Sequence, residues 1–267
     1  MIREQAQELN ILQNPVDLDL GEIFHLRYGP LDLYLERAES QLRLRWMTSQ
    51  DFMDSSFEYQ LPFKGMFPEN LLSEKRFAFT GKIPPLKILP CLGEKPFVAR
   101  PETPFMILPG EKTSIYLSTP MSLRIMDNQS HQIIDELPVI ERTKTWFGDS
   151  FTSGQLCFFT HIHAALKEDE LPFRPHRALT LVTIENRSKK TIQIKRLKIP
   201  APYLTLYQEE RGVFVTSTLN VKCDIKGKVK ELKIVRPSLG DGKNVQIFPP
   251  REALPSSIFK SVTELMR

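Results

Sequence analysis

The sequence lacks long apolar runs. No stretch approaches the roughly 18 consecutive apolar residues that a membrane-spanning helix needs, so we expect no transmembrane segment. Residues 1–22 also lack the apolar core and small-residue cleavage site of a secretory signal. From these two absences we expect a cytoplasmic protein.

Cysteine is scarce as well. The three cysteines, Cys91, Cys157 and Cys223, lie far apart, so they form no Cys-x-x-Cys pair of the kind that marks a zinc or redox site. We expect reduced, buried thiols. We predict no cofactor, and a divalent metal is an alternative that depends on the histidines discussed below.

Long stretches of helical periodicity are the third absence. Short runs rich in Ile, Val, Phe, Thr and Tyr recur instead between Pro, Gly and Asn/Asp punctuation, which predicts a mainly β protein. With 267 residues, 41% hydrophobic and 25% charged, the chain is typical of a folded globular protein. We predict two packed antiparallel β-sandwich-like modules and a short C-terminal helix within 255–266, capped by Ser256 or Ser257.

The clearest strand signals lie in the first half. Residues 22–46 alternate so that Leu31, Leu33 and Leu35 share one face, and Gly29-Pro30 supplies a turn. Residues 104–125 predict three strands with a turn at Pro109-Gly110. Residues 61–77 are expected to form a loop with at most one helical turn.

The polar segment 126–137 is the candidate boundary between the modules. It gives an N-terminal β module over 1–130 and a C-terminal immunoglobulin-like β-sandwich over 131–267, or one continuous domain. In the second module, residues 178–185 and 191–199 predict two strands joined by residues 186–189, as in many hairpins of such sandwiches.

The stretch WFGDSFTSG, residues 146–154, is similar to the first sequence block of the GDSL (SGNH) esterases, which would make Ser150 a nucleophile. A serine nucleophile needs a histidine held by an acid. The family's Gly-x-Asn-Asp and Asp-x-x-His blocks are missing, and no histidine follows His176. We therefore favour a structural turn between two strands, formed by Trp146, Gly148, Asp149 and Gly154.

Three histidines form a second candidate site. His161 and His163 would point to the same face of a strand and could chelate one metal ion, which His176 could complete. Two half-exposed histidines on an aromatic strand explain the spacing equally simply, and we favour that interpretation.

Positive charge is concentrated in the second half. Between Arg187 and Arg236 the net charge is +9, which leaves −5 for the rest of the chain. Such asymmetry can mark an anionic partner. Basic residues that alternate with apolar ones, as in residues 228–230, also describe a strand with one solvated face, the interpretation we favour. The candidate binding residues are Lys189, Lys190, Lys195, Arg196 and Lys198.

Three long segments, residues 142–160, 104–125 and 175–207, resemble a prokaryotic family, domain-of-unknown-function family 432. The resemblance covers roughly Leu20 to Val235. It implies that Trp-Phe-Gly-Asp at residues 146–149 is a structural feature, and it brings no activity or catalytic residues.

Three functions stay open. We favour a non-enzymatic binding or scaffolding module whose partner is another protein or a second copy of the chain. The first alternative is a metal-dependent or hydrolytic enzyme that uses the strand of His161 and His163. The second is binding to an anionic surface, either nucleic acid or membrane, through the basic region. Aromatic residues are sparse among its lysines, which argues against stacking on single-stranded nucleic acid.

Overall fold

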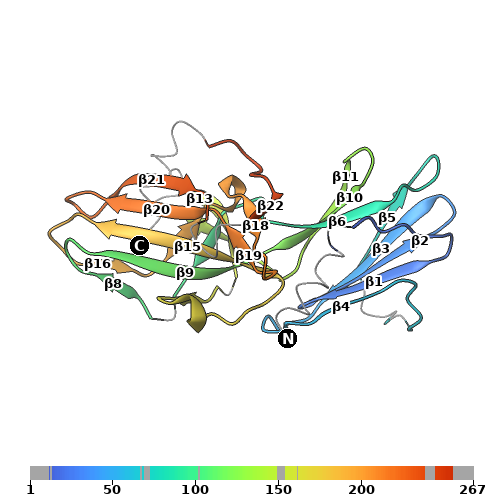
Figure 1. Ribbon diagram of the computed structural model, residues 1–267, viewed down its shortest axis with the longest axis horizontal. Coiled ribbons are helices and arrows are strands. Elements are labelled where there is room, and N and C mark those ends of the chain that lie inside the picture. Colours follow the sequence, from blue (N-terminus) through green and yellow to red (C-terminus); the bar gives the residue numbers. More distant parts are fainter. Residues whose placement is uncertain are drawn as a thin grey trace. The chain divides into compact units, whose positions relative to one another are not determined.

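A computed structural model describes residues 12, 14–66, 68, 73–101, 103–148, 154–160, 162–237 and 244–254. Within this part of the chain the structure is mainly β, as predicted (Figure 1). The predicted C-terminal helix and the centre of the turn at residues 149–153 lie outside the described residues. All three cysteines are reduced and buried, as the sequence predicted.

The chain forms two compact units. Unit 1 consists of Met1–Cys91, Met121–Glu141 and Arg174–His176, and unit 2 of Leu92–Pro120, Arg142–Phe173 and Arg177–Arg267. The units are interleaved along the sequence, which a single boundary near residue 130 does not describe. The polar segment that we expected to separate two modules lies inside unit 1, where it forms much of a hairpin.

The described residues of unit 1 form two antiparallel sheets. The first has the order β4-β1-β2-β3-β5 and the second β11-β10-β6. The strands are β1 (Ile23–Tyr28), β2 (Leu31–Arg37), β3 (Gln41–Thr48), β4 (Phe57–Gln60), β5 (Ser73–Ala78), β6 (Leu86–Cys91), β10 (Ser122–Asp127) and β11 (Ile133–Pro138). The alternation predicted over 22–46 is confirmed, because Leu31, Leu33 and Leu35 are all buried on β2. The loop expected over 61–77 ends early, since β5 pairs with β3.

In unit 2 the part of the chain that the structure describes forms three sheets, with orders β12-β13-β7-β17, β16-β8 and β14-β9-β15-β19-β18-β22. In the last sheet β20 also pairs with β15, and β21 with β20. The strands are β7 (Phe97–Ala99), β8 (Phe105–Ile107), β9 (Lys112–Pro120), β12 (Thr143–Phe147), β13 (Gln155–Phe159), β14 (Ala164–Ala165), β15 (Arg177–Asn186), β16 (Ile192–Ile194), β17 (Leu197–Ile199), β18 (Leu206–Gln208), β19 (Phe214–Thr216), β20 (Thr218–Cys223), β21 (Val229–Val235) and β22 (Val245–Phe248); two 3-10 turns, η2 (Glu168–Glu170) and η3 (Ala201–Tyr203), also belong to it.

The hairpin predicted between residues 178–185 and 191–199 does not form, because 178–185 lie in β15, which pairs with β9, β19 and β20. β16 pairs with β8, and β17 pairs with β7, so the two strands that follow β15 join other sheets. Local alternation predicts that a strand forms, but it does not determine which distant strand will lie along its edge and share its backbone hydrogen bonds. This part of the immunoglobulin-like expectation was therefore wrong.

The large sheet of unit 2 forks along one edge of β15. β19 pairs with β15 at Leu179, and β20 pairs with it from Val182 to Asn186. β19 and β20 follow each other along this edge, and their outer edges pair with different strands, β19 with β18 and β20 with β21 (Figure 1). The fork leaves the β20–β21 hairpin beside the carboxyl end of β15, where the candidate site lies.

Candidate functional site

Two turns meet at the end of the β15/β20 ladder. β15 and β20 are parallel, and Asn186 is in register with Cys223, the last residue of β20. Because parallel strands end at the same edge of a sheet, the residues that follow them emerge together. Arg187 and Asp224 are therefore neighbours although 37 positions separate them in the sequence.

The turn after β20 is held by its own backbone. The Asp224 carboxylate accepts hydrogen bonds from the backbone N–H groups of Lys226 and Lys228, at 2.8 and 2.9 Å. The Asp224 N–H donates to the Lys228 carbonyl at 2.7 Å, and Gly227 has a φ of +79°, which glycine adopts easily. These bonds fix the direction in which the two residues at the tip, Ile225 and Lys226, project.

The turn after β15 is held by Asn186, which is fully buried. Its amide nitrogen donates to the carbonyl oxygens of Ile107, Leu108 and Lys190, at 2.9–3.1 Å. Its side-chain oxygen accepts hydrogen bonds from the N–H and the hydroxyl of Ser188. Both the nitrogen and the oxygen of this amide are thus hydrogen-bonded within the protein. These bonds restrain the backbone that carries Arg187, Lys189 and Lys190.

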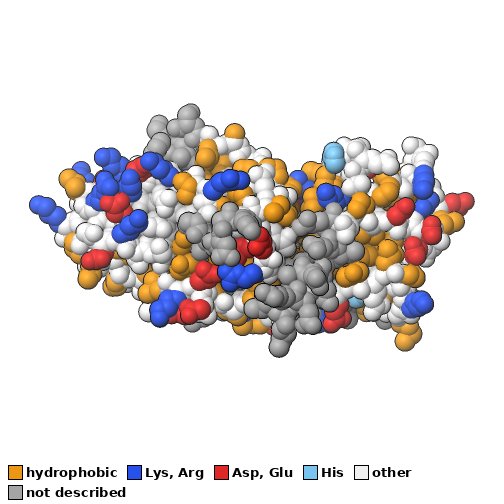
Figure 2. Space-filling model, in the orientation of Figure 1, with side chains coloured by type: hydrophobic (Ala, Val, Ile, Leu, Met, Phe, Trp, Pro, Cys, Tyr) orange, Lys and Arg blue, Asp and Glu red, His pale blue; other side chains and the backbone are white. Residues whose placement is uncertain are grey.

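The two turns adjoin, since a Cβ at Gly227 would lie 3.9 Å from the Ser188 hydroxyl oxygen. Beside them a cleft of about 650 Å³ opens, which we call the basic cleft. Basic side chains gather over β20 and β21 at this end of unit 2 (Figure 2). The cleft is lined by Arg187, Lys222, Cys223, Asp224, Ile225, Lys226, Lys230 and Glu231.

The acidic groups around the basic cleft are ionised and already bonded. The backbone N–H of Lys228, followed by that of Lys226, holds the pKa of Asp224 below its usual value. Lys233 and Lys222, at 2.9 and 3.1 Å, lower the pKa of Glu231. With four cations and two carboxylates in its lining, the cleft has an excess of positive charge at neutral pH.

Cys223 does not supply a reactive group to the cleft. Burial, with a smaller contribution from the Asp224 charge, raises the pKa of its thiol to about 11. The thiolate is the nucleophilic and metal-binding form of cysteine, and it is rare so far below this pKa. The groups of the lining that can contact a ligand are therefore the cations and the apolar side chain of Ile225.

The predicted binding residues divide into two groups. Lys189, Lys190 and Lys195 are exposed, and the first two lie in the turn beside the basic cleft. Arg196 is half-buried, with its guanidinium 5.6 Å from the centre of the Phe147 ring. Lys198 is 3% exposed and its ammonium lies 3.4 Å from the Gln155 amide oxygen, so it contributes to the interior of unit 2 and not to a surface.

The predicted metal ligands are distributed over both units. His163 lies in unit 2 and the fully buried His176 in unit 1, while His161 lies outside the described residues. Among the residues that the structure describes, no group of three or more His, Cys, Asp or Glu side chains is placed to hold a metal ion. The three-histidine site stays a prediction.

The flanks of the predicted turn at 146–154 pair as the sequence suggested. β12 and β13 are antiparallel, with Trp146 opposite Leu156 and Phe147 opposite Gln155. A Cβ at Gly154 would lie 2.5 Å from Cε2 of Trp146, so the indole ring packs where only glycine leaves room. Ser150 and Asp149 are outside the described residues, and their roles stay predictions.

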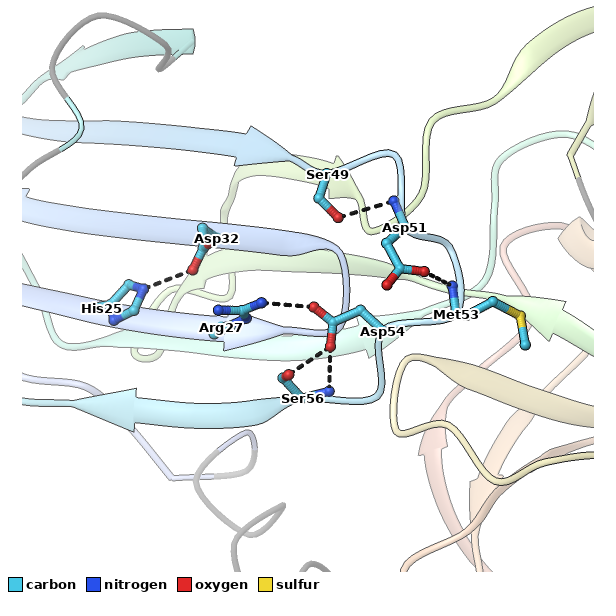
Figure 3. A network of polar contacts seen from close by, with 8 residues as sticks. All are labelled: His25, Arg27, Asp32, Ser49, Asp51, Met53, Asp54 and Ser56. Carbon is cyan, nitrogen blue, oxygen red and sulfur yellow. Dashed lines mark hydrogen bonds and ion pairs between the residues drawn. The ribbon is translucent and has the colours of Figure 1, made fainter.

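A second polar cluster lies in unit 1, along β1 and the β3–β4 loop (Figure 3). The Asp54 carboxylate accepts hydrogen bonds from the N–H and hydroxyl of Ser56 and pairs with Arg27 at 2.9 Å. On the same strand His25 lies 3.0 Å from Asp32 and stacks on Tyr34, with ring centres 4.5 Å apart. These contacts tie a loop to a strand, which is a structural role.

Comparison with known proteins assigns the chain to a family. Residues 14–267 match the family model described as "Protein of unknown function (DUF432)". The chain belongs to this family. No curated protein and no solved structure matches the DUF432 chain. Within its described residues, no helix has the length and apolar character needed to cross a membrane.

None of the five binding residues predicted from the sequence of the DUF432 chain lines the basic cleft. The basic region from 187 to 236 contains all four cations of the cleft. What the sequence did not indicate is that Arg187 lies beside Lys222 and Lys226. The available signal was the turn Asp224-Ile225-Lys226-Gly227, a turn sequence with lysines on both sides.

Proposed function

We propose that the protein is a non-catalytic binding module that holds an anionic ligand in the basic cleft. The observation that carries the proposal is the lining itself, in which four cations outnumber two carboxylates around a concave surface. Asp224 is bonded to backbone N–H groups, Glu231 pairs with Lys222 of the lining and with Lys233, and Arg187 pairs with Glu185. Lys226 and Lys230 are exposed, so their charges are available to a ligand from solution.

The same lining favours binding over catalysis. Its carboxylates have lowered pKa values, which makes them weak general bases and leaves them deprotonated at neutral pH. Its thiol has a raised pKa, which suppresses nucleophilic attack. Lysine ammonium groups on flexible stems are well suited to phosphate or carboxylate groups presented at a surface.

The experiment is calorimetric titration of the full chain with tripolyphosphate. The double substitution Lys226→Glu/Lys230→Glu reverses two charges of the lining, and we expect it to weaken binding at least about tenfold. The matched control is Lys144→Glu/Lys167→Glu, which makes the same charge change at two exposed lysines outside the lining. Equal weakening by both variants, or no binding by the wild type, would overturn the proposal.

A further inference from the structure

An exposed isoleucine occupies the tip of the turn that borders the basic cleft. Ile225 is 75% exposed, although burying such a side chain would normally stabilise the protein. The Asp224 hydrogen bonds hold the backbone on both sides of it, so the outward direction of Ile225 is a fixed property of the turn. A preformed apolar tip can enter an apolar medium without a further cost of ordering.

Lysines surround this tip on every neighbouring element. Lys226 and Lys228 lie in the same turn, Lys222 on β20 and Lys230 on β21. Lys189 and Lys190 lie in the adjoining turn after β15. The acids among them, Glu185, Asp224 and Glu231, are bonded to Arg187, to backbone N–H groups, and to Lys222 and Lys233.

An aliphatic side chain within a ring of lysines fits one kind of anionic partner. At a lipid bilayer the cations meet anionic headgroups while the apolar side chain reaches the acyl boundary just below them. We propose that the ligand of the basic cleft is the surface of an anionic lipid bilayer, on which the β20–β21 turn docks by inserting Ile225. This inference rests on the proposed function, because it names the source of the anionic groups.

Nucleic acid is a less suitable partner for the same residues than a bilayer. Its backbone would satisfy the lysines, but single strands also need exposed aromatic rings on which bases stack. The cleft lining contains none, and its apolar member is aliphatic. Ile225 at the tip has no partner in a phosphate backbone, whereas the interface of a bilayer accepts it.

The first experiment is cosedimentation of the full chain with vesicles of phosphatidylcholine, with and without phosphatidylserine. We expect binding only when phosphatidylserine is present. We expect Ile225→Ser to weaken it about five- to tenfold, and Lys226→Glu/Lys230→Glu at least about tenfold. The matched controls are Ile133→Ser, which changes an isoleucine 51% exposed on β11, and Lys144→Glu/Lys167→Glu. We expect both controls to bind like the wild type.

A second readout locates the tip directly. An environment-sensitive fluorophore attached to the variant Ile225→Cys should shift to the blue on phosphatidylserine vesicles, and the same label on Ile133→Cys should not. The native cysteines are buried, and the pKa of Cys223 is raised to about 11, so labelling at neutral pH is selective for the new thiol.

The outcomes separate this inference from the proposed function. Tripolyphosphate binding that depends on Lys226 and Lys230, without vesicle binding, would leave the proposed function standing and overturn the membrane surface. The membrane proposal would also be overturned if Ile225→Ser bound vesicles as tightly as the wild type, or if the emission of a fluorophore at residue 225 did not shift. Tighter binding to single-stranded RNA than to vesicles would assign the cleft to nucleic acid instead. Absence of tripolyphosphate binding by the wild type would overturn the proposed function, and with it this inference.

Discussion

Gly29 is constrained both by its backbone conformation and by a neighbouring side chain. It follows β1 with a φ of +56°, a backbone conformation that side chains other than glycine rarely adopt. A Cβ on it would also lie 2.7 Å from Cε1 of the buried His176 ring. The segment Arg174–His176 belongs to unit 1, and the Tyr28 hydroxyl donates a hydrogen bond to its Pro175 carbonyl. The ring therefore cannot withdraw without breaking other contacts.

We predict that Gly29→Ala lowers the free energy of unfolding by about 2–4 kcal/mol, through backbone strain and displacement of the His176 ring. Gly21→Ala is the matched control, because Gly21 has a φ of +79° but nothing within 4 Å of its Cβ position. It should cost only the backbone strain, about 1 kcal/mol. Urea denaturation followed by circular dichroism measures both. Equal losses would show that the His176 ring does not restrict this position.

Lys198 shows how a residue-level pattern misleads. In sequence it continues the basic run of Lys195 and Arg196, and it was predicted to bind an anion. In the structure it stands opposite Val98 in the β7–β17 ladder, on the face that carries Phe147 and Cys157. Which face of a strand is buried depends on the strands that pack on it, and this information is absent from the run itself.

At the scale of elements, the β3–β4 loop is attached to β1 through one carboxylate. Burial by itself would raise the pKa of Asp54, but the hydrogen bonds from Ser56 and the ion pair with Arg27 lower it overall (Figure 3). The attachment therefore stabilises the folded state while Asp54 is ionised. This stabilisation is fully present above the unfolded-state pKa of Asp54, about 3.9, and it is lost as the pH falls through the lower folded-state pKa.

We predict that Asp54→Asn removes part of the acid sensitivity of the protein. The variant should be less stable than the wild type at pH 7, and the difference should shrink as the pH falls below about 4. Urea denaturation over this pH range measures it. Asp169→Asn, at an exposed position in η2, is the control and should follow the wild-type curve. A difference that is independent of pH would contradict the assignment of the charge to Asp54.

The elements that sequence predicts well are those whose partners are local. β1, β2 and β3 pair with their sequence neighbours, and each presents its leucines to one face, so alternation and the Gly29-Pro30 turn were sufficient. The basic cleft depends on the parallel pairing of β15 with β20, over 30 residues apart in the sequence. Alternation carries no information about such pairing, so the basic region could be predicted but not the cleft.

At the scale of the whole molecule, charge is distributed unequally along the chain. Residues 187–236 carry a net charge of +9 and the remainder −5, so a net charge of +4 understates the attraction that an anionic surface exerts on the basic end of unit 2. Long-range attraction of this kind is screened by salt, with a Debye length of about 10 Å at 0.1 M. Insertion of an apolar side chain is not screened, because it removes apolar surface from water.

Salt should therefore separate the two contributions to vesicle binding. We predict that wild-type affinity for phosphatidylserine vesicles falls steeply between about 0.05 and about 0.5 M NaCl. Ile225→Ser should bind more weakly than the wild type by a constant factor across this range, since its loss is apolar. Lys226→Glu/Lys230→Glu should show a shallower dependence, and its deficit should narrow as salt rises. If Ile225→Ser changes the salt dependence as the lysine variant does, the isoleucine acts by shaping the turn that carries the charges and not by entering the bilayer.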